Sequence, residues 1–176
     1  MRDESPSPRL VQDFLANSFS ISVVRKMGPE GTLKCVRNFI KALDLTAIGK
    51  TSASHFTTTL NEQTKVFQQV LPSEARHWGI ARKCLNIFFR DALYNFYLRE
   101  QYDLTKFEEY LEIPLDSRVG KRLRCELEGS ELPRWRTVKG LTHEDSNKFQ
   151  DVAAAVAKRR RTRRVHLDLI YWRGED

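Results

Sequence analysis

The chain has 176 residues, and 40% of them are hydrophobic, which is enough to bury one sizeable core and excludes disorder of the whole chain. Lys and Arg number 30 against 23 Asp and Glu, giving a formal charge of +7. Such an excess favours binding to a polyanion, although solubility alone also accounts for it. Cys35, Cys84 and Cys125 lie far apart with no CxxC pair, so neither a zinc site nor a disulfide framework is encoded.

No apolar run reaches the roughly 18 residues that a membrane span needs. The opening residues, "MRDESPSPRL", are acidic and rich in Pro and Ser, which is unlike a signal peptide. We therefore expect an intracellular protein in a reducing cytoplasm, with no membrane partner.

Apolar residues recur at spacings of three and four through most of the chain, and this pattern predicts helices. In chain order the predicted helices cover about residues 10–24, 33–43, 54–72, 73–96, 105–111, 117–127 and 143–156. Ser73, Asp116 and Thr142 are the expected N-caps, Thr105 to Glu108 resembles a capping box, and Gly129 is the expected C-terminal stop. The helix after Ser73 is the most apolar and aromatic, so we place it at the centre of the core.

The C-terminal stretch "VHLDLIYW", residues 165–172, alternates well enough for a strand. A lone strand among helices has no partner for its backbone groups, so we expect it to be helical or extended instead. The predicted fold class is therefore all-α.

Common catalytic signatures are absent from the sequence. GxxxxGKS, GxGxxG and HExxH do not occur, and the four histidines are scattered. We expect no metal and no organic cofactor. Two stretches remain as candidates for chemistry: "HWGIARKCLNIFFRDALYNFYL" around Lys83 and "IPLDSRVGKRL" around Asp116.

Together these stretches resemble helix-hairpin-helix superfamily DNA glycosylases, and most closely their archaeal-type 8-oxoguanine DNA glycosylase/lyase branch. In that branch a lysine near the start of a central aromatic helix precedes a proline-hydrophobic-aspartate-x-arginine-valine signature. Here Asp116 follows Lys83 by 33 residues, within Pro114-Leu115-Asp116-Ser117-Arg118-Val119. The C-terminal "RVHLDLIYW" is similar to a late helix of the family, so the resemblance covers roughly residues 73–172. The superfamily's Leu-Pro-Gly-Val-Gly hairpin is replaced by "EARHWGIARK".

The resemblance implies a two-lobed helical glycosylase fold with its active site between the lobes. We expect a single compact helical unit over 1–176, in which 1–72 and 142–176 contribute one lobe and 73–141 mostly the catalytic helices. Lys83 would be the Schiff-base nucleophile of an AP lyase, its neutral amine favoured by apolar neighbours and by the charge of Arg82. Asp116 would stabilise the oxocarbenium-like transition state while it caps its own helix.

An extruded base needs aromatic faces to stack on, and phosphates need cations. The expected base-pocket residues are Trp78, Phe88, Trp135 and Trp172, with Phe89 as a further possibility. The expected DNA contacts are Arg82, Arg118, Lys121, Arg122, Arg134 and Arg136. The partner would be double-stranded DNA carrying 8-oxoguanine or another modified base, bound by a monomer that associates with the nucleoid.

Each feature also has a simpler explanation. Taken alone, Lys83 can be an ordinary surface lysine, and Asp116 can be an ordinary N-cap after a proline. The arginine run at 158–164 suits a solvated helix end as well as a DNA-backbone clamp. His166 and Asp168 suit hydrogen bonds between helices, or contact with Lys83. The alternative functions are a non-enzymatic basic helical nucleic-acid-binding protein and a protein-interaction module.

Overall fold

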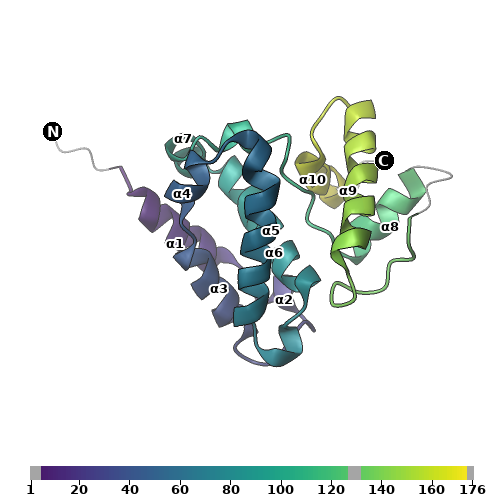
Figure 1. The fold of residues 1–176 in the computed structure, drawn as a ribbon, viewed down its shortest axis with the longest axis horizontal. Coiled ribbons are helices and arrows are strands. Elements are labelled where there is room, and N and C mark those ends of the chain that lie inside the picture. Colours follow the sequence, from purple (N-terminus) through teal and green to yellow (C-terminus); the bar gives the residue numbers. More distant parts are fainter. Residues whose placement is uncertain (1–4, 127–131, 174–176) are drawn as a thin grey trace.

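A computed structural model describes residues 5–126 and 132–173, and within these residues every regular element is a helix (Figure 1). The predicted all-α class is thus confirmed for this part of the chain. The α-helices are α1 Pro8–Ser18, α2 Ile21–Val24, α3 Thr32–Ala42, α4 Leu45–Lys50, α5 Phe56–Val70, α6 Trp78–Tyr94, α7 Phe96–Gln101, α8 Ser117–Glu126, α9 His143–Arg159 and α10 Leu167–Arg173. The 3₁₀ helices are η1 Ala53–His55, η2 Ser73–Ala75, η3 Leu104–Phe107 and η4 Arg164–His166.

Two of the expected N-caps are confirmed. The Asp116 Oδ1 atom accepts hydrogen bonds from the amides of Arg118 and Val119, and the Thr142 hydroxyl accepts one from Asp145. These bonds satisfy donors that the first turn of a helix leaves unpaired. Residues 165–172 are helical, as one of the two expected alternatives had it. The expected stop at Gly129 lies outside the described residues.

Other helix ends differ from the sequence pattern. Ser73 opens the 3₁₀ turn η2, and α6 begins only at Trp78. The helix expected over 10–24 is divided, because Phe19 turns into the core and its carbonyl accepts two hydrogen bonds from Arg37. The expected capping box at Thr105 to Glu108 is not formed: Thr105 lies inside the 3₁₀ helix η3, and Glu108 follows it as the C-cap.

The larger hydrophobic cluster surrounds α6, which is the predicted centre of the core. Its members come from helices α1 to α7 and from η3, with Val138 and Val165 added from later in the chain. Phe56 packs edge-on against Phe89 and stacks on Phe107. Aromatic residues at helical spacing along α6 therefore serve packing before anything else.

The smaller cluster joins α8, α9 and α10, and it begins at Ile113. The peptide of Ile113 is held from both sides by Gln150, whose side-chain oxygen accepts from its amide and whose nitrogen donates to its carbonyl. This division differs from the predicted one, because the hydrophobic residues of α9 and α10 pack with those of 113–132 and not with those of 1–72. Figure 1 shows α8, α9 and α10 grouped at one end of the molecule.

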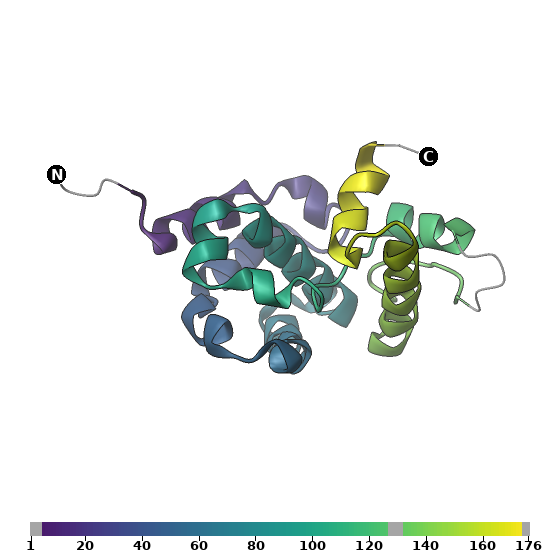
Figure 2. The same cartoon turned by 90° about the horizontal axis from the view of Figure 1, so that it is seen from above.

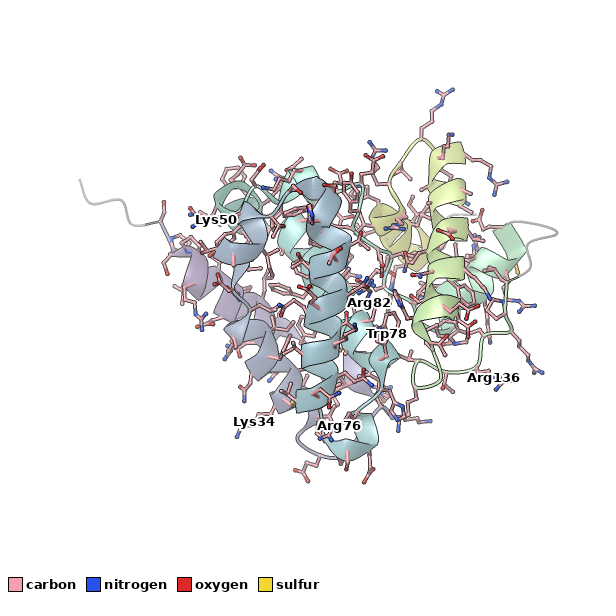
Figure 3. The ribbon with its side chains drawn as sticks, in the orientation of Figure 1. Lys34, Lys50, Arg76, Trp78, Arg82 and Arg136 are labelled. Carbon is pink, nitrogen blue, oxygen red and sulfur yellow. The ribbon has the colours of Figure 1, made fainter. Side chains whose placement is uncertain are left out.

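A buried ion pair lies where the chain passes from one cluster to the other. Arg82 of α6 donates two hydrogen bonds of 2.8 Å to the carboxylate of Glu112, and a third to Thr64. Asn86 donates to the same carboxylate. Burial would raise the pKa of Glu112, but the charge of Arg82 and these hydrogen bonds outweigh burial and lower it. Figure 3 shows Arg82 directed toward this boundary, away from solvent.

Candidate active site

A cavity of about 340 Å³ opens where α2 and α10 meet the first turn of α8. Its volume falls within the roughly 300–1,000 Å³ typical of small-molecule sites. It is lined by Ser22, Val23, Lys83, Ile87, Arg90, Pro114, Asp116, Asp168, Leu169 and Trp172. Figure 2 shows the yellow α10 at the upper edge of the molecule, next to α9. The cavity thus brings together Lys83 and Asp116, the two residues that the sequence singled out.

Lys83 enters the cavity from the second turn of α6 and is only 8% exposed. Its amine donates a hydrogen bond of 3.3 Å to the carbonyl of Val23, at the end of α2. No carboxylate of the described residues forms an ion pair with it. The amine is therefore held by a neutral acceptor beside the apolar wall of Ile87, which is a suitable position for a nucleophile.

Asp116 is fixed by its capping role. Its Oδ1 atom accepts from two amides of α8 at 2.9 and 3.0 Å, and the preceding Pro114 and Leu115 are buried. Such hydrogen bonds restrict the rotation of the carboxylate. The same carboxylate lines the cavity. Asp116 is therefore both the expected cap and a wall of the cavity; its predicted catalytic role stays a prediction.

Arg90 and Asp168 form a second charged pair in the cavity wall, and no role for this pair was predicted. Arg90 bridges Asp168 of α10 and its own neighbour Asp91. Burial raises the pKa of Asp168, the Arg90 charge opposes that shift, and the charge of Asp116 adds to it. Of the two expectations for Asp168, the bond between helices is the one observed. Arg90 lies one further turn along α6 from Lys83 and Ile87. Helical spacing could therefore have placed it on the same face as Lys83.

Trp172 is the one predicted base-pocket residue that lines this cavity. It is 61% exposed at the end of α10, and the guanidinium of Arg118 lies 4.6 Å from its ring centre. A cation over an indole face is a favourable arrangement. The mouth of the cavity therefore presents an accessible aromatic surface beside a positive charge.

The other predicted base-pocket residues lie elsewhere. Phe88 is fully buried in the larger cluster, and Phe89 is 3% exposed. Trp78 is half-buried and packs against His143, with the guanidinium of Arg82 5.2 Å from its ring. Trp135 contacts Phe149 edge-on and borders a separate cavity of about 330 Å³. The structure assigns all four to packing positions outside the cavity that holds Lys83.

The predicted DNA contacts divide into a buried group and an exposed group. Arg82 is 2% exposed and committed to Glu112, so its expected DNA contact does not hold, and its charge is neutralised by that carboxylate. Arg122 is half-buried beside Glu126 and Tyr171. The exposed cations are Arg118, Lys121, Arg134 and Arg136.

Residues 158–164 are mostly tied to neighbouring segments. Arg159 and Arg160 bond to Glu126, Arg163 lies 3.7 Å from the carboxylate of Glu109, and Arg164 donates to the carbonyls of Tyr110 and Leu111. His166 bonds to Glu108 and to Tyr94. This run therefore fastens the end of α9 to the rest of the protein.

Comparison with protein-family models, curated proteins and solved structures finds no match to this chain. Among residues 5–126 and 132–173, no three His, Cys, Asp or Glu side chains come together as a metal site would require. Nor does any helix within those ranges have the length and apolar character to cross a membrane.

The cavity combines three chemical capacities. Lys83 supplies an amine beside an apolar wall, Asp116 supplies a rigid carboxylate, and Trp172 supplies an aromatic face open to solvent. An amine and a carboxylate in one pocket suit covalent catalysis at an electrophilic carbon, in which the carboxylate stabilises the positive charge that develops there.

Proposed function

We propose that this protein is a bifunctional DNA glycosylase and AP lyase that removes an oxidised or otherwise modified base from duplex DNA. The observation that carries the proposal is that Lys83 and Asp116, on different helices and 33 residues apart, line one cavity. The resemblance of "IPLDSRV" and "RVHLDLIYW" to the archaeal-type 8-oxoguanine branch supports the same reaction. In this proposal the two hydrophobic clusters are the two lobes of a glycosylase fold, and the cavity lies between them.

The first step is displacement of the base. The modified nucleotide leaves the duplex and enters the cavity, where Trp172 offers a stacking face. The neutral Lys83 amine bonds to C1′ of the sugar as the bond from C1′ to the base breaks, and the base departs with the bonding electrons. The Asp116 carboxylate stabilises the positive charge on the sugar and accepts the proton that the amine loses.

The second step is cleavage of the strand. The sugar ring opens to give a protonated imine between Lys83 and C1′, which acidifies the protons at C2′. Removal of one of these protons expels the 3′ phosphate by β-elimination. Water then releases the lysine from the imine. No metal or organic cofactor takes part in either step.

Borohydride reduction tests the proposal, because it converts the imine into a stable amine and joins protein to DNA. The substrates are duplexes that carry 8-oxoguanine, an abasic site or a modified cytosine. We expect an adduct with the wild-type protein and none with Lys83→Gln. Asp116→Asn keeps the helix cap, so we expect it to slow base release by about 10²-fold or more without unfolding the protein.

Lys50→Gln is the matched control, because Lys50 is exposed at the end of α4 and lines no part of the cavity. Its adduct yield should equal that of the wild type. No adduct on any duplex, including the abasic one, would contradict the lyase activity. DNA binding without any adduct or base release would favour a non-enzymatic nucleic-acid-binding protein.

A further inference from the structure

Exposed cations from three separate loops gather near the N-terminal end of α6. Arg25 and Lys26 follow α2, Arg76 precedes α6, and Arg134 and Arg136 lie in the loop before α9. We call these five residues the basic edge. None of them forms an ion pair with a carboxylate of the described residues. Figure 3 shows Arg76 and Arg136 toward the lower margin of the molecule.

Each of the three loops packs closely against a neighbouring segment. A Cβ atom added to Gly28 would lie 2.6 Å from the Cβ of Ala75, so the first loop rests on the second. A Cβ added to Gly79 would lie 2.1 Å from the carbonyl oxygen of Val138, so the third loop rests on the first turn of α6. Both distances are shorter than real Cβ contacts, so glycine at each position permits a close approach of the neighbouring segment. The cations of the basic edge are therefore carried on a fixed surface.

At the opposite end of the molecule, several exposed cations form ion pairs. There Arg99 pairs with Glu100, Lys106 with Asp103, and Arg163 with Glu109. Carboxylates neutralise these charges locally, whereas the basic edge leaves its own charges to solvent. Glu30 and Glu74 are exposed in the same loops, so the basic edge is a group of cations unpaired within the described residues and not a region without acidic residues; such exposed cations attract a polyanion.

The basic edge is continuous with the mouth of the cavity. Ser22 and Val23 of α2 line the cavity, and Arg25 follows two residues later. Lys26 has a φ of 61°, a left-handed conformation in which glycine or asparagine is usual. Lysine is unfavourable in this backbone conformation, and the Lys26 side chain is exposed. The N-terminus of the long helix α6 lies behind these cations and adds the positive end of its dipole.

We propose that the basic edge binds the phosphate backbone of duplex DNA and so places the duplex over the cavity. The choice of DNA as the polyanion rests on the proposed function. Cations on three rigid loops suit an extended row of phosphates better than a single anion, because no two of the loops surround one point. Each cation that neutralises a phosphate releases condensed counterions, so binding weakens as salt rises.

The salt dependence of binding tests this surface without requiring any chemistry. The probe is an undamaged fluorescent duplex, and the measurement is the slope of log K against log salt concentration by anisotropy. We expect Arg25→Gln, Arg76→Gln and Arg136→Gln each to reduce the slope by about 1, and the triple variant to reduce it by about 3. Lys50→Gln removes an equal charge at the opposite end and should leave the slope unchanged.

The outcomes separate this inference from the proposed function. A triple variant with the wild-type slope would overturn the basic edge, even if the wild-type protein still forms the borohydride adduct. A reduced slope in a protein that forms no adduct would support the basic edge and contradict the glycosylase. Tighter binding to duplex RNA than to duplex DNA, or no DNA binding at low salt, would overturn the inference. Circular dichroism of each variant confirms that these exposed substitutions leave the fold intact.

Discussion

Two adjacent residues of α6, Arg82 and Lys83, project about 100° apart around the helix and have very different surroundings. Arg82 donates two hydrogen bonds to Glu112 and one to Thr64 at the boundary between the clusters, and Asn86 donates a further one to the same carboxylate. Lys83 lines a cavity and contacts a single carbonyl. The carboxylate commits Arg82 to the fold, whereas Lys83 borders open space, as the proposed function requires of it.

The contrast also shows why burial alone does not identify a functional residue. Both side chains have low exposure, 2% for Arg82 and 8% for Lys83. What separates them is the partner: Arg82 meets a bidentate carboxylate, whereas Lys83 meets a single neutral carbonyl. The two sides of α6 can be tested separately by variants that remove each partner.

The largest effect on stability is expected at the ion pair between Arg82 and Glu112. Glu112→Ala leaves a buried guanidinium without its carboxylate, so we expect it to lower the free energy of unfolding by about 3–5 kcal/mol. Urea denaturation measures this loss. The double variant Arg82→Met with Glu112→Leu removes both charges and should cost much less. A loss below about 1 kcal/mol in Glu112→Ala would mean that the pair contributes little to the fold.

A smaller effect on stability is expected at Asp116, the N-cap of α8. Asp116→Ala removes the cap of α8, and we expect it to lower the free energy of unfolding by about 1 kcal/mol. Asp116→Asn keeps an accepting oxygen and should stay close to the wild type in thermal or urea unfolding. Equal destabilisation by both variants would show that the negative charge, and not the capping oxygen, stabilises this turn.

The smallest effect is expected at Asp168, on the far wall of the cavity. Burial raises its pKa in the folded protein, so the folded state binds the proton more tightly than the unfolded chain does. The stability that this group contributes is present below its unfolded pKa of about 3.9 and is lost as pH rises through the folded value. The stability of Asp168→Asn relative to wild type should therefore increase from about pH 3.5 upward.

Urea denaturation at several pH values measures that difference, and Asp91 is common to both proteins and largely cancels. A relative stability that decreases with rising pH would contradict the prediction. It would mean that the Arg90 charge outweighs burial at this carboxyl.

Sequence patterns predicted the features that depend on local spacing. The apolar repeat identified α6 as the central helix, and short polar side chains before apolar runs identified the caps at Asp116 and Thr142. The resemblance to a glycosylase family paired Lys83 with Asp116, and both line one cavity. The family itself stays a prediction, since no comparison tests it.

Features that depend on distant partners were not predictable in this way. Arg82 and Lys83 are neighbours in sequence, and nothing local says which of them meets Glu112, 30 residues later. The arginines of residues 159–164 look like a free basic tail until Glu126, Glu109 and two backbone carbonyls are placed beside them. Phe88 and Trp172 are both aromatic, and only tertiary packing separates a core residue from one at the mouth of a cavity.

The two hydrogen bonds between the Gln150 side chain and the peptide of Ile113 fix the segment that connects the two clusters. Asp116 lies three residues beyond Ile113 and is attached to the smaller cluster. Lys83 belongs to α6, the helix at the centre of the larger cluster. Any opening of one cluster against the other would therefore change the separation of amine and carboxylate directly. If the two residues act together, closure of the protein around DNA and assembly of its catalytic pair are a single movement.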